Sequence, residues 1–160
     1  MFSNCIGRAV LVAALSWGGM AECAAALPKG VLPFGPSTWQ AMKRELPRPA
    51  VVVFTTTDCA YCPDVIDELA AEFRNATPRV ALLVVVMDGA YKPASWLAEP
   101  HYRKADRLYA FQGQEAALRF GIDPKWRGIT PFVAMLGRSG EPQLITGRPS
   151  QKQLSLLRGQ

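Results

Sequence analysis

The segment "VVVFTTTDCAYCPDVIDELA", residues 51–70, constrains the fold more than any other part of the chain. The β-branched apolar run at 50–55 predicts a buried strand. From Pro63 onward the apolar residues recur with helical spacing, and the acidic residues that follow suit a helix start, since the first turn carries partial positive charge. The sequence therefore predicts a strand that turns directly into a helix, with Cys59 and Cys62 at the turn.

Strand and helix patterns alternate along the rest of the chain. The apolar run at 80–87 has no polar alternation, which is typical of a central strand covered on both faces. A hairpin is predicted at 132–136 and 143–146, and 107–111 allows a further short strand. Helices are predicted at 38–46, at 95–106 with a division at Pro100, at 113–121 and from 150 onward.

Local end signals accompany three of these helices. Ser37 with Gln40 and Ser150 with Gln153 have the spacing of capping boxes, and Gly121 is a predicted C-cap. Strands that alternate with helices indicate a parallel core, to which the terminal hairpin adds an antiparallel edge. The predicted class is α/β, with one domain in a chain of 160 residues.

The first 26 residues read as a secretory signal peptide. Arg8 supplies a short positive region, the apolar run at 9–21 is shorter than the roughly 20 residues that span a bilayer, and Ala24 and Ala26 place small residues before a cut near Ala26. A retained membrane anchor is the alternative. A lipoprotein cut before Cys23 is disfavoured by the preceding glutamate. Residues 27–36, rich in proline and glycine, form a leader that lies on the surface or adds an edge strand.

Removal of this signal has two consequences. Cys5 and Cys23 leave with it, so the mature chain holds only Cys59 and Cys62. The expected location is periplasmic or secreted, where disulfides form and persist.

The formal net charge is +5, and the densest basic cluster lies at 103–107. That cluster has no interleaved aromatic residues, so a solvated face is expected there rather than nucleic-acid binding.

The cysteine pair allows several kinds of site. A redox-active dithiol fits best, because a helix N-terminus stabilises the attacking thiolate. Cys59, the more exposed, would attack, and Cys62 would resolve the mixed disulfide. A structural zinc site usually needs four ligands, and the mature chain adds only His101. Covalent haem would need histidine where Pro63 stands. A purely structural disulfide remains open.

These motifs resemble the thioredoxin-fold family. The resemblance rests on "VVVFTTTDCAYC", on the helix after it and on "FGIDPKWRGITPFVAML". It covers roughly residues 37–159, so residues 37–160 are expected to form one thioredoxin-like domain. It implies a central mixed sheet of four to five strands with helices on both faces, and an insertion at about 89–112 like that of secreted TlpA-like and ResA-like reductases. It also implies a cis proline at Pro131 that faces the cysteines, with the Thr130 backbone pairing with an extended substrate segment.

Other residues refine or depart from this resemblance. Ala60-Tyr61 is similar to the Gly-Tyr pair of periplasmic disulfide isomerases, so Tyr61 is a candidate substrate contact. The buried aspartate of ordinary thioredoxin is replaced by Val53, and the tryptophan before the first cysteine by Asp58. The proton acceptor for Cys62 is thus unassigned. Glu99 and Glu115 are the candidates.

The expected function is a thiol:disulfide oxidoreductase that reduces protein disulfides. Asp58 and Asp64 flank the motif, and their charge opposes the helix end, so only a moderate depression of the Cys59 pKa is expected. The expected partners are protein thiols or disulfides and a membrane-borne electron donor, with no cofactor, no metal, no nucleic acid and a monomeric chain. A non-catalytic binding module, or a disulfide isomerase or oxidase, is the alternative.

Overall fold

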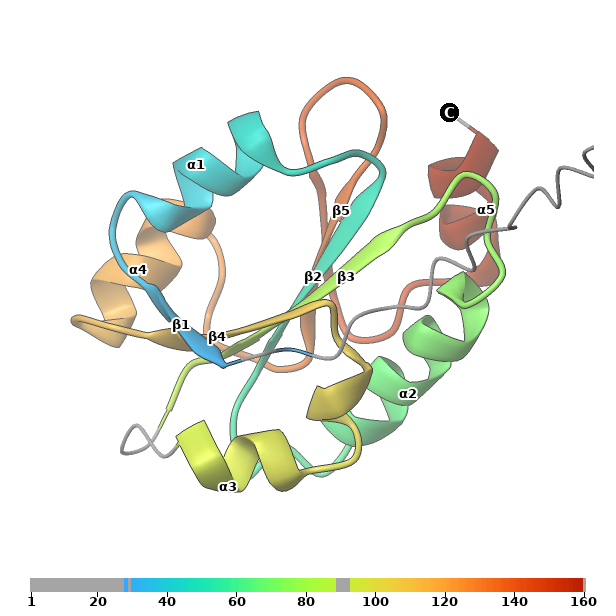
Figure 1. Ribbon diagram of the computed structural model, residues 1–160. Coiled ribbons are helices and arrows are strands. Elements are labelled where there is room, and N and C mark those ends of the chain that lie inside the picture. The colour runs from blue at the N-terminus through green and yellow to red at the C-terminus, as the bar shows by residue number, and fades with distance from the viewer. Residues whose placement is uncertain (1–27, 29, 89–92, 160) are drawn as a thin grey trace, which may run out of the picture.

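The computed structural model describes residues 28, 30–88 and 93–159. The predicted signal peptide at 1–26, with Cys5 and Cys23, lies outside the described residues. The domain is built on one six-stranded sheet in the order β1-β4-β3-β2-β5-β6, shown in Figure 1. Its strands are β1 (Val31–Phe34), β2 (Ala50–Thr55), β3 (Ala81–Val86), β4 (Arg107–Phe111), β5 (Phe132–Leu136) and β6 (Gln143–Thr146).

The sheet is mixed, as the sequence predicts. Strands β1, β4, β3 and β2 are parallel to one another, whereas β5 and β6 add an antiparallel hairpin beside β2. Six strands are present instead of the expected four to five. The two segments for which a strand was only one option, 27–36 and 107–111, both contribute strands to the sheet. Strand β4 pairs with β3, and β1 pairs with the other edge of β4.

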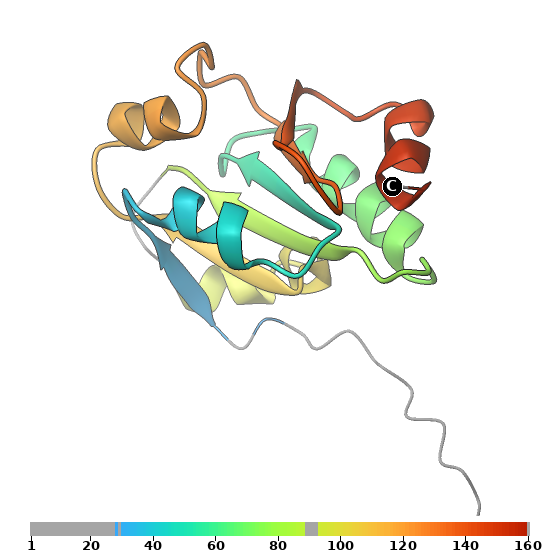
Figure 2. The same ribbon diagram turned by 90° about the horizontal axis from the view of Figure 1, so that it is seen from above.

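Helices cover both faces of the sheet, as Figures 1 and 2 show. The helical elements are α1 (Thr38–Glu45), α2 (Cys62–Phe73), α3 (Pro93–Ala98), the 3₁₀ turn η1 (Tyr102–Lys104), α4 (Glu115–Ile122) and α5 (Gln151–Gly159). Helices α1 and α4 pack on one face, and α2, α3, η1 and α5 pack on the other. The segment predicted to be helical at 95–106 is divided into α3 and η1 on either side of Pro100.

Alternation along the strands divides the core between these two faces. In β2, Val51 and Val53 face α2 and α5, whereas Val52 and Phe54 face α1 and α4. All six residues of β2 are buried. Such a strand reads as a continuous apolar run because neither of its faces meets water. Phe54 also contacts Trp126, with ring centroids 5.3 Å apart, and so anchors the segment that follows α4.

Two of the predicted helix-end signals are wrong and one is confirmed. Ser37 precedes α1 without a side-chain cap bond; the Thr38 hydroxyl instead accepts a bond from the Gly35 amide. Gly121 lies inside α4, which continues to Ile122, because no left-handed turn occurs at this glycine. The second capping box forms, since the Ser150 amide donates to Gln153 and the Gln153 amide donates back to the Ser150 hydroxyl.

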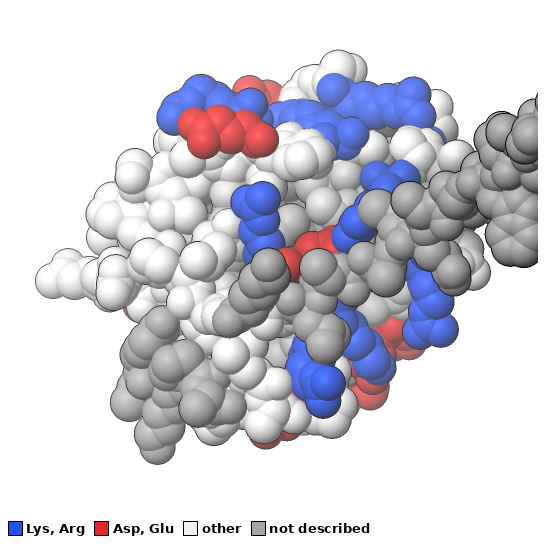
Figure 3. Space-filling view, in the orientation of Figure 1, with Lys and Arg blue, Asp and Glu red and all other residues white. Residues whose placement is uncertain are grey.

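The face of the molecule in Figure 3 carries charged side chains of both signs. Acidic side chains lie beside several of the basic ones, and a run of basic side chains follows the upper edge. Lys104, within the basic cluster at 103–107, lies 2.7 Å from Asp67 on α2. Within the described ranges, no helix is long and apolar enough to cross a membrane.

Candidate functional site

Cys59 and Cys62 form a disulfide at the junction of β2 and α2. Their Cα atoms lie 5.5 Å apart. Cys62 is the first residue of α2 and is fully buried, whereas Cys59 lies in the preceding loop and is partly exposed. The more accessible sulfur is therefore that of Cys59, as the sequence predicts.

The helix end beside this disulfide favours negative charge. The N-cap residue Tyr61 makes no side-chain capping bond. Its side chain therefore does not occupy the amides of the first turn. The Cys62 amide donates to the Cys59 carbonyl at 3.3 Å, which folds the loop tightly onto the helix. Upon reduction, partial positive charge at the start of α2 would stabilise a Cys59 thiolate.

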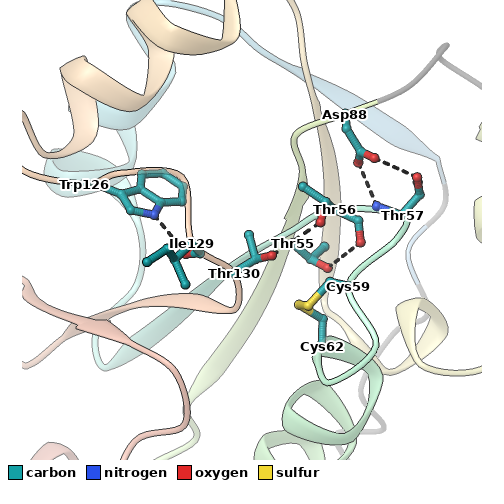
Figure 4. Close-up of a disulfide and its surroundings, with 9 residues drawn as sticks. All are labelled: Thr55, Thr56, Thr57, Cys59, Cys62, Asp88, Trp126, Ile129 and Thr130. Atoms are coloured by element: carbon teal, nitrogen blue, oxygen red, sulfur yellow. Dashed lines mark hydrogen bonds between the residues drawn. A yellow bond between two sulfur atoms is a disulfide. The ribbon is translucent and has the colours of Figure 1, made fainter.

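Three consecutive threonines before the motif each make a side-chain hydrogen bond. Thr55, at the end of β2, donates its hydroxyl to the Thr56 carbonyl at 3.1 Å. The Thr56 hydroxyl lies 3.3 Å from that of Thr130. Thr57 donates its amide and its hydroxyl to the two carboxylate oxygens of Asp88, both at 2.7 Å. Figure 4 shows the second and third of these contacts around the disulfide.

The Thr130–Pro131 peptide bond is cis, as the resemblance implies. Pro131 is buried. The loop before it is held by Trp126, whose indole N–H donates to the Ile129 carbonyl at 3.0 Å. Gly128 has φ +84°, a conformation that favours glycine. This loop therefore enters β5 in a defined path that brings Thr130 next to the loop before Cys59.

Two large apolar side chains near the disulfide are open to solvent. Tyr61, inside the motif, is 75% exposed, and Ile129, in the loop before Pro131, is 61% exposed. Ile129 and Thr130 lie across from the cysteines in Figure 4. Exposed large apolar groups that gather at one place commonly mark a contact surface.

A cavity of about 310 Å³ opens beside Cys59 on the α3 side. Its lining combines hydroxyl groups from the threonine run with the indole of Trp96, and it includes Glu99, His101 and Tyr102. The described part of the predicted insertion therefore forms one wall of the space next to Cys59. Residues 89–92 of the insertion lie outside the described residues.

The two ring side chains of this wall have shifted acidities. Burial raises the pKa of Tyr102 to about 12, and nearby carboxylates of Asp88 and Glu99 add to this, although the bond to Thr55 opposes it. Burial lowers the pKa of His101 below 6.5, while the charges of Glu99 and Asp67 act in the opposite direction. Both rings are therefore uncharged near pH 7.

The two candidate proton acceptors lie in different places. Glu99 lines the same cavity as Cys59. Glu115 begins α4, which packs on the face opposite to α2, and forms an ion pair with Arg119 at 3.0 Å. Val53 is fully buried among apolar side chains, so the sheet itself offers no carboxylate at that position. Of the two, Glu99 is the one that shares a cavity with Cys59.

Several groups at the site were not expected from the sequence. They are the anchoring roles of Thr55, Thr56 and Thr57, the carboxylate of Asp88 and the exposed Ile129. Asp88 follows β3 directly, and the carboxyl ends of parallel strands meet at one edge of a sheet, where sites form. That rule is the one sequence signal that could have drawn attention to Asp88. Among the described residues, no group of three or more His, Cys, Asp or Glu side chains is arranged to hold a metal ion.

No protein-family model matches the chain, and no curated protein matches it. Several solved structures are similar. The reduced N-terminal domain of PilB from Neisseria meningitidis has 19% identity and a TM-score of 0.50, over 77% of this chain and 94% of that one. A thio-disulfide isomerase from Thermus thermophilus has 17% identity and a TM-score of 0.50, over 73% of this chain and 83% of that one.

A third similar structure is a putative thioredoxin from Neisseria meningitidis, with 13% identity and a TM-score of 0.50 over 67% of this chain and 69% of that one. At such low identities, the similarity to these structures concerns the fold alone. The chain has the thioredoxin fold, and its cysteine pair lies where β2 passes into α2.

Proposed function

We propose that the protein is a thiol:disulfide oxidoreductase that reduces protein disulfides through a Cys59/Cys62 cycle. One observation carries the proposal. A partly exposed sulfur and a buried sulfur are bonded at the start of α2, and the loop that ends in a cis proline is tied to the segment before them. This arrangement offers one sulfur to a client and keeps its partner within bonding reach.

Reduction of a client begins from the dithiol form. The Cys59 thiolate attacks one sulfur of the client disulfide; a Cys59–client bond forms, the client S–S bond breaks and the other client sulfur leaves as a thiolate that takes a proton. Cys62 then loses its proton and attacks the Cys59 sulfur. The Cys59–Cys62 bond forms, the Cys59–client bond breaks, and the second client sulfur leaves as a thiolate that takes a proton. The client departs with two thiols, having gained the two electrons that the protein lost.

Client contacts are proposed at the edge that surrounds Cys59. An extended client segment would pair with the backbone of Thr130, next to Pro131, and its side chains would contact Tyr61 and Ile129. Support for this comes from the exposure of both side chains, from the position of Tyr61 between the two cysteines in the sequence, and from the position of Ile129 across from them in Figure 4. Glu99 is the proposed acceptor of the Cys62 proton, because it is the candidate on the Cys59 cavity.

The cellular setting is also part of the proposal. A signal peptide at 1–26 would send residues 27–160 to the periplasm or the exterior, leaving only Cys59 and Cys62 in the mature chain. The spent disulfide would be reduced there by a membrane-borne dithiol donor. This resembles the secreted TlpA-like and ResA-like reductases.

The charge around the motif favours reduction over oxidation. Asp58 and Asp64 are exposed and flank the cysteines, and the sequence from Thr55 to Val65 contains no basic residue. A less stabilised thiolate makes the dithiol a better reductant than in strongly oxidising relatives. An isomerase would commonly need a dimeric client cleft, whereas a reductase can act as a single chain, and we propose a monomeric reductase.

Insulin reduction tests the proposal. The chain beginning at Leu27 is expected to accelerate insulin precipitation by dithiothreitol, and Cys59→Ser is expected to be inactive. Cys62→Ser is expected to trap client proteins as mixed disulfides that dithiothreitol releases. If the wild type is no faster than dithiothreitol alone and Cys62→Ser traps nothing, the protein is a binding module with a structural disulfide.

A further inference from the structure

We propose that Asp88 is a positioning residue, which stabilises the Cys59–Cys62 disulfide by clamping the backbone of Thr57. This inference deepens the proposed function and rests on it. It starts from the "TTT" run at 55–57, which the sequence places immediately before the motif.

The clamp continues a ladder between two strands beyond the point where the strands end. Strands β2 and β3 pair in parallel up to Thr55 and Val86. One step further, the Met87 amide donates to the Thr55 carbonyl at 2.9 Å. After that the backbones no longer pair, and the Asp88 carboxylate takes over by accepting both the amide and the hydroxyl of Thr57.

Both bonds to Asp88 are 2.7 Å long. Hydrogen bonds to an ionised carboxylate are shorter and stronger than those between neutral groups. Two bonds from one residue to the two oxygens also fix orientation as well as distance. The loop residue two positions before Cys59 is therefore held at its backbone and at its side chain together.

The clamp acts on Cys59 through the backbone. Thr57 lies between Thr56, whose carbonyl accepts the Cys59 amide at 3.2 Å, and Asp58, which leads into Cys59. Fixing Thr57 therefore restricts the positions that the Cys59 sulfur can occupy. Ordering backbone costs conformational entropy, and a loop already ordered in the dithiol form loses less of it when the S–S bond closes.

The consequence can be written as an equilibrium with glutathione. Protein dithiol and oxidised glutathione give protein disulfide and two molecules of reduced glutathione, with two electrons passing from the protein to glutathione. A loosened loop lowers the effective concentration of one sulfur at the other. The equilibrium then shifts toward the dithiol, and the pair becomes more oxidising.

Thr57→Val is the decisive variant, because it removes the hydroxyl while keeping the shape, the amide and every charge. Thr57→Ser is its matched control, since serine keeps both donors. Asp88→Asn removes the charge that strengthens both bonds, and it also removes a negative charge that disfavours a thiolate, so both of its effects act in the same direction. Thr57 is exposed and Asp88 is partly exposed, so all three variants should fold.

The test uses the full chain with Cys5 and Cys23 replaced by serine in every sample, so that Cys59 and Cys62 are the only thiols. Each protein is equilibrated with glutathione buffers of varied ratio, quenched with acid and alkylated to count free thiols. We expect Thr57→Val to lower the equilibrium constant for disulfide formation about three- to tenfold, a tenfold change being about 30 mV. Thr57→Ser should match the parent, and Asp88→Asn should shift at least as far as Thr57→Val.

The double variant Thr57→Val/Asp88→Asn should shift the equilibrium less than the sum of the single variants, because both changes break one clamp. The proposal is overturned if Thr57→Val matches Thr57→Ser, or if the two single effects add fully. This assay does not require a client. A parent chain that exchanges with glutathione but does not reduce insulin would refute the proposed function and leave the clamp testable.

Discussion

The hydroxyl groups of Thr56 and Thr130 lie 3.3 Å apart, although 74 residues separate them in the chain. This contact joins the loop that presents Cys59 to the loop that ends in cis Pro131. It ties the proposed reacting group to the proposed client-binding edge by a single bond.

Thr130→Val breaks this link without altering the backbone that is proposed to pair with a client. Because the bond is neutral and partly buried, its loss should lower the free energy of unfolding by about 1 kcal/mol. The effect on kcat/KM for insulin should stay below about tenfold. Denaturant unfolding and insulin reduction measure the two effects.

Thr130→Ser keeps the hydroxyl and serves as the control. If serine and valine variants lose stability equally, the contact between the hydroxyls is not the cause.

Tyr61→Ala and Ile129→Ala should weaken the binding of protein clients. Both side chains are exposed, so stability should change by no more than about 0.5 kcal/mol. The loss of an apolar client contact of about 1 kcal/mol corresponds to an increase in KM of about fivefold. Initial rates with insulin and with a small aromatic disulfide separate binding from thiol chemistry, since only the insulin reaction should suffer.

Phe120→Ala supplies the comparison for this pair, because Phe120 is 66% exposed but lies on α4. An equal rise in KM for Phe120→Ala would contradict a client surface confined to Tyr61 and Ile129.

His101 should titrate below pH 6.5, because burial lowers its pKa. It is the sole histidine in the sequence, so its ring signals can be followed by NMR without assignment. The unfolded chain binds the proton more tightly than the folded one. Stability should therefore be unaffected by His101 above pH 6.5 and should fall as the pH drops from there through the lowered value.

Glu99→Gln should lower the His101 titration midpoint further, since the Glu99 charge acts to raise it. A midpoint at or above 6.5 in the parent chain, or a higher midpoint in Glu99→Gln, would refute this account of the histidine.

Tyr102 should remain protonated until close to pH 12. Since the unfolded phenol loses its proton near pH 10, stability should decline as the pH rises from about 10 to 12. Tyr102→Phe should remove this dependence. Ultraviolet absorbance follows the formation of the phenolate, and denaturant unfolding at several pH values follows the stability. An unchanged alkaline decline in Tyr102→Phe would contradict the raised pKa of Tyr102 as its cause.

The local pattern of residues 50–73 predicted the central features of the fold and of the candidate site. A run of buried valines, a helix start and two cysteines between them are short-range signals, and the structure has β2, α2 and their disulfide there. The cis bond before Pro131 needed the family resemblance, because proline alone allows both isomers.

Partnerships across long distances in the chain were harder to predict. The segment 27–36, which contains β1, has three prolines and could be a surface leader or an edge strand. Its place is defined only by the pairing of β1 with β4, some 77 positions later. The same applies to Thr57 and Asp88, which are 31 residues apart. Neither residue has a distinctive neighbourhood, and only the parallel pairing of β2 with β3 brings them together.

The reduction midpoint of the Cys59–Cys62 pair tests the central claim most directly. Equilibration with glutathione, read by alkylation of free thiols, gives this value. The account predicts a reversible two-electron transition near the value of thioredoxin, about −270 mV. A value near that of strongly oxidising relatives, about −120 mV, would contradict a reductase, and a pair that never exchanges would contradict redox function altogether.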